Sequence, residues 1–465
     1  MIAPRLSWLV IGLLPLAIGG AVAPGESVEW MTAARSAVAD GPPAEQRRAL
    51  TQAESWLLDH PEDRVARTIH AELALRVGEL LTAEDAIAAL LENEDGLPAA
   101  AYRVAGMLAI ARGDHATAQR LAEDGLADYP DDLPLLFWSA EAAASRADAL
   151  KRLRRYVARG PDGGADPDRL TAARGTIAVY EALGDTAVWR RSQAPESGVL
   201  ALRPLWSSNK RLQGYLLRVP AARGRRPIRL LLDSGSTGLF LTSSAARRLN
   251  FEPMAETTTF GGGGEGRHRS RRGLVPRLAL GDLVYENAMA TVTPGALDAG
   301  GRYDGLVGLQ PFADYLLTLD GENRELRFTQ TDEALDGERY WNFSGQMLVR
   351  GVAADGVRGL FVFDTGAYET LVSRTFADRL TDVTILEGGA VRGFGGRMRG
   401  LRVVDGGRVG FMELSTNDRR LVALDLAIAS RLGGVELAGY LGLDLLGETL
   451  IEVDLRTQRV RVRRP

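Results

Sequence analysis

Leu231-Leu232-Asp233-Ser234-Gly235-Ser236 recurs, with similar residues, as Val362-Phe363-Asp364-Thr365-Gly366-Ala367. Each copy is predicted to be a buried apolar strand that runs into a sharp turn with one carboxylate at its tip. A single Asp-Ser/Thr-Gly segment is common and predicts little. Two copies with matching surroundings indicate two half-sites that meet, and two facing carboxylates form an acid–base pair that can activate water.

The chain around each copy repeats one order of features, at about residues 205–330 and 340–465. Each half has an apolar strand, a strand ending in the Asp motif, a helix signal, a Gly-rich stretch, an apolar pair before Gly, and a closing hairpin. The matching landmarks are Tyr215–Val219 and Met347–Arg350, Thr242–Leu249 and Ser373–Leu380, Gly261–Gly266 and Gly388–Gly396, Leu306–Gly308 and Tyr440–Gly442, and the turns at Asp320 and Asp454. Agreement at five landmarks predicts an internal duplication.

The composition of the chain excludes several kinds of catalytic and metal site. The 465 residues, 45% hydrophobic and 25% charged, are typical of a globular chain of two or three domains. The absence of cysteine excludes thiol catalysis, disulfides and thiolate metal sites. None of the four histidines has metal-ligand spacing, so neither a metal nor a cofactor is expected. The net charge of −4 gives no indication of nucleic-acid binding.

The N-terminus is predicted to be an export signal, residues 1–23. Arg5 precedes the apolar run from Leu6 to Ile18, and Ala21-Val22-Ala23 forms a small-x-small cleavage site. Cleavage there would leave no stable membrane span, whereas an uncleaved run would be a membrane anchor interrupted by Pro15. In either case we expect the bulk of the chain to be exported, into a bacterial periplasm or out of the cell.

Residues 30–192 are Ala- and Leu-rich and have the pattern of short helices joined by tight turns. Gly78 and Gly113 lie 35 residues apart in similar turns, and Pro61 and Pro130 lie 69 apart, about two such periods. The pattern is similar to tetratricopeptide repeats, which stack helix pairs around a continuous core and leave a concave face. Three roles stay open: a groove for a peptide or partner protein, a purely structural domain, or a propeptide.

Composition changes after the helical part. Residues 193–204 are predicted to form a linker, because Pro, Ser and Gly follow one another closely from Gln193 to Gly198. Beyond it, short Val/Leu/Ile runs alternate with Gly-rich turns, which is typical of β structure. The predicted fold class is therefore multidomain α plus all-β: an N-terminal helical repeat domain followed by two β lobes, at residues 205–335 and 340–465.

The order of Asp-Thr/Ser-Gly, Gly-rich stretch and apolar pair before Gly resembles the aspartic peptidases, over residues 205–465. Only 131 residues separate the two aspartates, which is short for a pepsin. The first Gly-rich run also lacks the Tyr that pepsins carry there, since Tyr303 lies elsewhere. The chain is therefore similar to a covalently fused retropepsin dimer, as in bacterial exported aspartyl protease family proteins. The resemblance implies closed, retropepsin-like β-barrel lobes with the cleft between them.

The resemblance implies that Asp233 and Asp364 form a catalytic dyad. One shared proton lets one carboxylate act as a base toward water and the other as an acid toward the carbonyl oxygen, and the pair titrates as a unit. Ser234 and Thr365 would hydrogen-bond across the interface between the lobes. These two hydroxyl residues would hold the two Asp loops rigid.

The glycines of the motif also receive roles from the resemblance. Gly235 and Gly366 would let the lobes approach closely and would permit positive φ. Gly308 and Gly442 would let a neighbouring strand pass under each Asp loop. Ser236 could hydrogen-bond the carboxylate of its own lobe, whereas the alanine that replaces it in the second copy could not.

Both Gly-rich stretches are expected to form flaps that close over substrate, donate backbone hydrogen bonds and exclude water. The flap glycines are Gly262, Gly263, Gly264, Gly393, Gly395 and Gly396. Substrate would lie extended, as an added strand. The alternative is a flexible hairpin tip; a phosphate loop is disfavoured because no strand–loop–helix context surrounds either run. The basic segment Arg267–Arg272 is expected to be a solvated flap strand; the alternatives are a preference for acidic substrates and binding of a polyanion.

Three functions fit these features. The first is an exported aspartic endopeptidase acting on a peptide or protein, whose helical domain recruits or restricts substrate or binds a partner protein. The second is a non-enzymatic scaffold that binds peptides through a degenerate peptidase fold. The third is a glycosidase, which also uses paired carboxylates. Intact Asp, hydroxyl and Gly at both motifs favour the peptidase.

Overall fold

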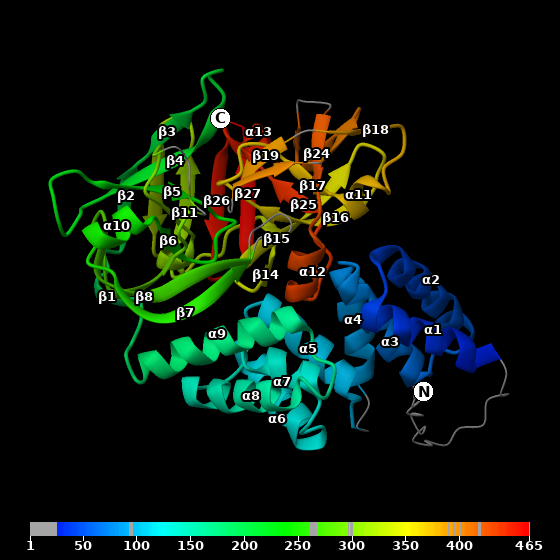
Figure 1. Ribbon diagram of the computed structural model, residues 1–465. Helices are drawn as coiled ribbons and strands as arrows, with labels where there is room; N and C mark the ends of the chain where they lie inside the picture. Colours follow the sequence, from blue (N-terminus) through cyan, green and yellow to red (C-terminus); the bar gives the residue numbers. More distant parts are fainter. Residues whose placement is uncertain are drawn as a thin grey trace, which may run out of the picture.

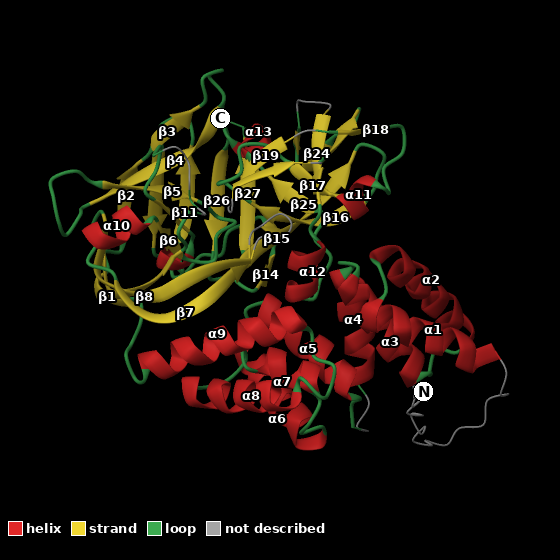
Figure 2. Cartoon of the chain, viewed as in Figure 1, coloured by secondary structure: helices red, strands yellow, loops and turns green. Residues whose placement is uncertain are grey.

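The computed structural model describes residues 26–92, 96–260, 267–295, 297, 301–388, 390–393, 396–399, 401–416 and 420–464. An all-helical N-terminal part packs beneath a mostly β C-terminal part, as Figures 1 and 2 show. The predicted export signal, residues 1–23, lies outside the described residues. Within the described residues, no helix combines the length and the apolar character that crossing a membrane requires.

Nine helices make up the described N-terminal part. They are α1 (Glu26–Asp40), α2 (Pro43–Asp59), α3 (Arg64–Arg76), α4 (Leu80–Leu91), α5 (Ala99–Ala111), α6 (His115–Asp128), α7 (Leu133–Ser139), α8 (Arg146–Arg159) and α9 (Pro167–Leu183). Asp63 and Asp132 cap the helices that follow the two Pro-Asp segments, because each carboxylate accepts free backbone N–H groups of the first turn.

The turns at Gly78 and Gly113 are equivalent, as their spacing predicts. Both glycines have positive φ, 82° and 75°, and each joins two helices, α3 to α4 and α5 to α6. The residue after each glycine donates its N–H to a carbonyl five residues back, from Glu79 to Ala74 and from Asp114 to Ala109. The two hairpins therefore share one turn geometry, while the tetratricopeptide assignment stays a prediction.

The segment predicted as a linker is not a free connection. β1 (Arg190–Gln193) pairs with β9 (Leu283–Val292), and β2 (Ser197–Ala201) pairs with β12 (Glu325–Thr329). The composition of this segment does not predict these strands, because whether a residue is in a β-strand depends more on the partner strand than on the local sequence. The chain is thereby held against the β part from Arg190 onward.

The β part contains two lobes with one strand order. Lobe 1 has the order β3-β4-β5-β10-β6-β9-β8-β7, and lobe 2 has β14-β15-β16-β25-β17-β24-β21-β18. Their further strands are β3 (Arg203–Trp206), β4 (Leu212–Val219), β5 (Ile228–Leu232), β6 (Leu239–Leu241), β7 (Glu252–Phe260), β8 (Arg267–Leu280), β10 (Gly305–Val307), β14 (Trp341–Phe343), β15 (Gln346–Ala353), β16 (Arg358–Phe363), β17 (Leu371–Ser373), β18 (Thr384–Glu387), β21 (Arg402–Asp405), β24 (Arg420–Leu424) and β25 (Gly439–Leu441). The parallel pairs also correspond, β5·β10 with β16·β25 and β6·β9 with β17·β24. This agreement is what an internal duplication produces.

Several short elements complete the β part. They are α10 (Ser243–Arg248), η1 (Gln310–Phe312), α11 (Arg374–Ala377), β19 (Ala390–Gly393), β20 (Gly396–Arg399), β22 (Val409–Phe411), β23 (Leu414–Ser415), α12 (Ala427–Gly433) and α13 (Leu443–Leu446). Thr242 and Ser373 cap α10 and α11, the two helices predicted after the Asp motifs.

The closing hairpins of the two halves join into one shared sheet. β11 (Leu316–Asp320) and β12 form the first hairpin, and β26 (Leu450–Asp454) and β27 (Arg459–Arg463) form the second. β11 and β26 pair antiparallel about Thr318 and Glu452, and β2 and β13 (Glu338–Arg339) complete the six strands. The sequence predicted both hairpins but not their pairing, which ties the lobes together.

The helical part shares a hydrophobic core with lobe 2. One buried cluster contains Leu75 and Leu108 of the helices together with Trp341, Leu360 and Val362 of the lobe. Polar contacts surround this core; Trp341 Nε1 donates to Glu84 Oε1 at 3.3 Å, for example. A second cluster joins Val179 and Leu183 of α9 to Leu274 of β8. The helices are therefore packed on both lobes rather than joined to them by a tether.

Candidate active site

The two aspartates follow equivalent strands and lie between the lobes. β5 ends immediately before Asp233, and β16 ends immediately before Asp364. Each strand has a parallel neighbour whose last carbonyl accepts the aspartate N–H, at 3.0 Å for Val307 and 3.1 Å for Leu441. Both turns thus leave their sheets at the same structural position and face each other.

Side-chain hydroxyls bind the two Asp loops to each other. Ser234 Oγ donates to Phe363 O at 2.7 Å, and Thr365 Oγ1 donates to Leu232 O at 3.0 Å. Each hydroxyl also accepts the backbone N–H of the other residue, at 3.0 and 3.1 Å. Ser234 and Thr365 are buried. These are the cross-lobe hydrogen bonds predicted for the pair, and they make the position of each loop depend on the other.

Gly235 and Gly366 lie directly against the carboxylate of the opposite lobe. A Cβ on Gly235 would lie 2.6 Å from Asp364 Cγ, and one on Gly366 would lie 2.4 Å from Asp233 Cγ. Neither glycine is among those with positive φ. Space, and not the φ freedom that the sequence also suggested, is therefore what requires glycine here.

Gly235→Ala and Gly366→Ala are expected to lower kcat for peptide cleavage by about a hundredfold or more, because the methyl group displaces the opposite carboxylate. Gly238→Ala is the matched control, because Gly238 lies in the same loop as Gly235 and a Cβ there would have no atom within 4 Å. Initial rates with one peptide substrate measure the effect. Equal rates for Gly235→Ala and Gly238→Ala would show that the close approach does not matter.

Burial and proximity shift the titration of both aspartates. Burial raises the pKa of Asp233 well above its usual range, and the neighbouring Asp364 carboxylate raises it further. Burial also raises the pKa of Asp364, although the N–H of Gly366 and a hydrogen bond from Asp233 act against this. Asp364 Oδ1 accepts N–H groups from Gly366 at 2.8 Å and Ala367 at 3.1 Å. The arrangement favours one proton shared by the pair.

The same shifts predict how stability depends on pH. Because the folded-state pKa of Asp233 is raised above the ordinary value of 3.8, the folded protein keeps a proton that the unfolded chain loses. This contribution to stability is present below that value and is lost as pH rises toward the folded pKa. Asp233→Asn is therefore expected to have a larger free energy of unfolding than the wild type at about pH 7, and an equal one at about pH 3. Urea titrations at the two pH values measure it; a variant less stable than the wild type at neutral pH would contradict this.

The two glycines after the apolar pairs lie beneath the Asp loops. A Cβ on Gly308 would lie 2.3 Å from Ser236 O, and one on Gly442 would lie 2.6 Å from Glu369 O. The Ser236 hydroxyl, however, donates to Gly238 O at 3.3 Å, not to the carboxylate as predicted. The backbone N–H of Ser236 acts on Asp233 instead. Asp233 and Asp364 are therefore supported mainly by backbone N–H groups in both lobes.

The predicted flaps are equivalent hairpins. β7 and β8 form the first, and its tip with Gly262, Gly263 and Gly264 lies outside the described residues. The second is β18 and β21 with the small hairpin β19·β20 at its end, where Gly393 pairs with Gly396; Gly395 lies outside the described residues. In the first hairpin, α9 lies against β7, since a Cβ on Gly175 would contact Thr257 at 3.6 Å.

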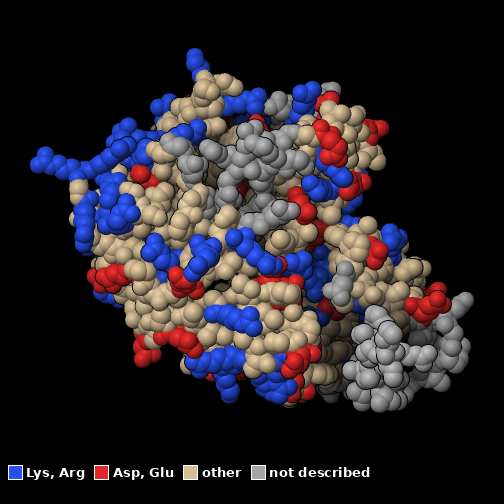
Figure 3. Space-filling view, in the orientation of Figure 1, with Lys and Arg blue, Asp and Glu red and all other residues tan. Residues whose placement is uncertain are grey.

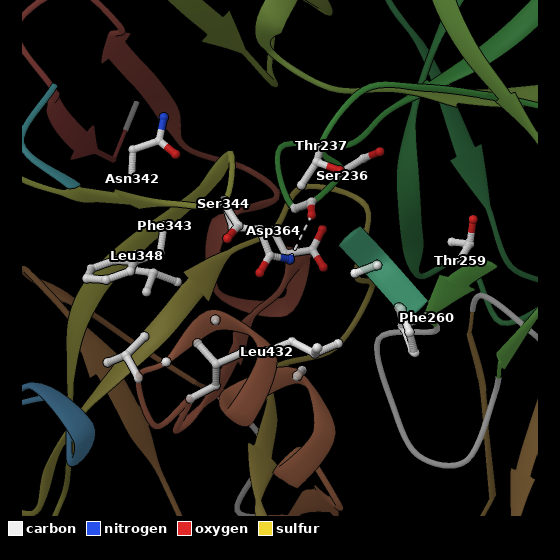
Figure 4. Close-up of a pocket in the computed structure, with 18 of the residues that line it drawn as sticks. Ser236, Thr237, Thr259, Phe260, Asn342, Phe343, Ser344, Leu348, Asp364 and Leu432 are labelled. Atoms are coloured by element: carbon white, nitrogen blue, oxygen red, sulfur yellow. Dashed lines mark hydrogen bonds between the residues drawn. The ribbon is translucent and has the colours of Figure 1, made fainter. Parts of the chain in front are cut away.

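A cavity of about 1030 Å³ contains the dyad. Residues of both lobes and of the helical part line it, and Figure 4 shows Asp364 between the Ser236–Thr237 turn and Phe260 at the end of β7. Phe343, Leu348 and Leu432 lie on another side. Among the residues that the structure describes, no cluster of His, Asp and Glu could hold a metal ion. The arrangement provides a partly apolar cleft with two carboxylates at its centre.

Sequence reasoning missed several residues of this site. Gln346 Nε2 donates to Gly235 O at 3.2 Å and fixes the first loop. Thr370 Oγ1 accepts the N–H of Gly442 at 3.1 Å and donates to Asp444 at 2.7 Å, which fixes the second. Tyr440 lies next to the dyad, and burial raises its pKa. Tyr440 belonged to a recognised landmark, but no local pattern pointed to Gln346 or Thr370.

The helical part also contributes a wall of the cavity, which the sequence left open. Leu75 of α3, Met107 of α5, Trp138 of α7 and Thr176 of α9 line the same space as the dyad. The wall depends on packing between segments that are far apart in the chain, so no repeat pattern predicts it. The space beside Asp233 and Asp364 is consequently bounded by helices as well as by both lobes.

Comparison with known proteins agrees with the geometry of lobe 1. Residues 219–310, from the end of β4 through Asp233 and the first flap to Gln310, match the family model for aspartyl protease. The chain therefore contains an aspartyl protease-like domain. No curated protein matches the chain. Among solved structures, the crystal structure of basic 7S globulin from soybean is similar at 11% identity and a TM-score of 0.33, covering 58% of this chain and 95% of that chain.

Proposed function

We propose that this protein is an exported aspartic endopeptidase that hydrolyses peptide bonds with water activated by Asp233 and Asp364. The observation that carries the proposal is the reciprocal arrangement of the two loops. Four cross-lobe hydrogen bonds fix them, and each glycine lies against the opposite carboxylate. Two carboxyls held this closely share a proton, which is what acid–base hydrolysis without a metal requires.

The chemistry follows from one shared proton. The ionised carboxylate takes a proton from water as the water oxygen bonds to the peptide carbonyl carbon, while the other carboxyl gives its proton to the carbonyl oxygen. In the second step a hydroxyl of the tetrahedral intermediate returns a proton to the pair, and the amide nitrogen takes one as the C–N bond breaks. The pair ends with the single proton it began with. The two carboxyls therefore supply and recover every proton that the reaction transfers.

The helical domain is proposed to bind substrate. Its residues and those of both lobes line one cavity with the dyad, so an extended peptide in the cleft contacts the helices. The flap hairpins are proposed to close over that peptide and add backbone hydrogen bonds. The two lobes and the helical wall together restrict which segments enter, which favours unfolded or flexible peptide substrates.

Export is part of the proposal and rests on the export signal that the sequence predicts at residues 1–23. Expression of the full chain, followed by fractionation and N-terminal sequencing of the mature protein, tests it. A mature chain that begins after Ala23 outside the cytoplasm is expected. A full-length protein retained in the cytoplasm would remove export from the proposal without affecting the chemistry.

The activity is tested with the purified mature chain and a mixed peptide library, between about pH 3 and pH 8, with product identification by mass spectrometry. Parallel reactions contain pepstatin. Internal cleavage that pepstatin suppresses is expected. Peptides that bind to the protein but stay uncut at every pH would favour a non-enzymatic binding protein. Cleavage by variants that lack Asp233 or Asp364 would show that other residues carry the activity.

A further inference from the structure

Five arginines of the described chain line the cavity, and four of them lie on the helices and on the first predicted flap hairpin. Arg76 ends α3, Arg103 lies on α5, Arg169 lies on α9, and Arg272 lies on β8. They come from segments up to about 200 residues apart, so only the packing of helices on lobes brings them to one space. A guanidinium in a partly apolar wall is costly to bury unless another group compensates its charge.

Within the described residues, carboxylates form ion pairs with Arg103 but not with Arg76 or Arg169. Glu72 forms an ion pair with Arg103, and Asp132 lies 3.9 Å from the same guanidinium. Arg169 donates to the carbonyl of Arg431 at 2.7 Å and lies over the Phe137 ring at 5.6 Å, while its Nε has no hydrogen-bond partner among the described residues. The nearby Asp166 and Tyr156 attract its charge without forming an ion pair within 4.0 Å. Glu141, the other carboxyl of this wall, forms no ion pair with these arginines within the described residues, and burial raises its pKa.

Arg76 is the most isolated of these charges. Within the described parts of the chain, no carboxylate oxygen comes within the 4.0 Å of an ion pair with its guanidinium. Burial lowers the pKa of Arg76 to about 10, with Glu72 acting against this and the charges of Arg169 and Arg103 adding to it. Arg76 therefore stays charged at neutral pH, next to two other cations and one ion-paired carboxylate.

Arg272 is a separate position. Its closest charged or titratable influence is Tyr180 of α9, and burial lowers its pKa. Tyr180 lies eleven residues beyond Arg169 on the same helix, a rise of about 16 Å. The anion-binding group is therefore Arg76 with Arg103 and Arg169, and Arg272 belongs to the flap side of the cleft.

We propose that Arg76, Arg103 and Arg169 form an anion subsite of the cleft, which binds a carboxylate of the peptide substrate. The proposal rests on the proposed function and adds a specificity to it. A bound carboxylate would supply the missing negative charge, and guanidinium groups bind carboxylates with paired, charge-assisted hydrogen bonds. The carboxylate can come from an acidic side chain or from the free C-terminus of a peptide.

Arginines on the outer surface do not have this setting, and Arg302, which also lines the cavity, donates to Gln213 Oε1. Figure 3 shows many Lys and Arg side chains over lobe 1 and the helices, where water solvates them. Arg48 on α2, for example, is 70% exposed and 3.9 Å from Glu45. Such charges bind little by themselves. The subsite differs because its three charges line one cavity together.

Binding is measured on the Asp233→Asn/Asp364→Asn double variant, so that the result does not depend on turnover. The probes are fluorescein-labelled peptides of one neutral sequence, amidated at the C-terminus, with Glu or Gln moved through successive positions. A further peptide has no Glu but a free C-terminal carboxylate. Fluorescence anisotropy gives Kd for each. A Glu preference at one position identifies a side-chain carboxylate, and a preference for the free C-terminus identifies the other source.

We expect the carboxylate peptide to bind about tenfold more tightly or better than its neutral match, and Arg76→Gln to abolish the difference. Arg76→Lys should retain part of it, and Arg48→Gln, which removes the same charge from an exposed face, should retain all of it. Thermal unfolding should show that Arg76→Gln is no less stable, because an unpaired enclosed charge is removed. Equal Kd values for carboxylate and neutral peptides, or a preference that survives Arg76→Gln, would overturn the subsite. Either result leaves the proposed peptidase activity, which the wild-type cleavage assay tests separately.

Discussion

The Asp233→Asn and Asp364→Asn proteins are each expected to cleave peptides about a thousandfold more slowly than the wild type. Asparagine keeps the shape of the side chain, but it can neither take a proton from water nor give one to the carbonyl oxygen. The backbone N–H groups that support each carboxylate, such as that of Gly366 on Asp364, remain in place. The loss therefore reports the missing acid–base function.

The expected loss is the same for both aspartates, since each supplies half of one proton-sharing pair. Asp405→Asn is the control, because that carboxylate is 43% exposed and pairs with Arg420 at the edge of lobe 2. Initial rates with a single fluorogenic peptide at the optimal pH compare the three. Substantial turnover by either dyad variant would eliminate the two-carboxylate mechanism.

A fragment that begins at Ser197, and so lacks the helices, is expected not to fold. Trp341, Leu360 and Val362 of lobe 2 share a buried cluster with the helical part. Exposing each large apolar side chain costs about 1.5–3 kcal/mol, and the net stability of a domain is only about 5–15 kcal/mol. Losing several such contacts together is therefore expected to remove the folded state of lobe 2.

Size-exclusion chromatography and thermal unfolding followed by near-ultraviolet circular dichroism measure this outcome. The fragment should aggregate or lack a cooperative transition, while the whole chain, purified in the same way, should be monodisperse and unfold cooperatively. A fragment that is stable, cooperative and active would show that the helices are a removable propeptide. The shared core favours an integral domain over that propeptide role.

The Asp loops and the duplicated lobes could be predicted because their information is local. Asp-Ser/Thr-Gly, the helix caps at Thr242 and Ser373, and the closing hairpins each depend on neighbouring residues, and the same order in both halves made them reliable. The order of eight strands in each lobe then corresponds, while β22 and β23 pair beside β15 in lobe 2. The glycine turns at Gly78 and Gly113 were predictable for the same reason.

The linker strands, the hydrogen bond of Ser236 and the arginines of the cavity could not be predicted, because they depend on the three-dimensional fold and not on local sequence. β2 belongs to a segment that reads as a linker, and only its pairing with β12 makes it a strand. The Ser236 hydroxyl could reach a carboxylate or a carbonyl, and only the loop conformation selects Gly238 O. Arg76 and Arg169 are ordinary helix residues in the sequence, and helix packing alone brings them to the cavity.

The pH dependence of kcat/KM for one cleaved peptide tests the central claim, that Asp233 and Asp364 act as one pair with one shared proton. The account predicts a bell-shaped profile, because activity requires one carboxyl protonated and the other ionised. Its alkaline limb should lie well above the ordinary aspartate pKa of 3.8, since burial and Asp364 raise the pKa of Asp233. A profile that rises to a plateau with no alkaline loss of activity would contradict the shared proton and with it the proposed mechanism.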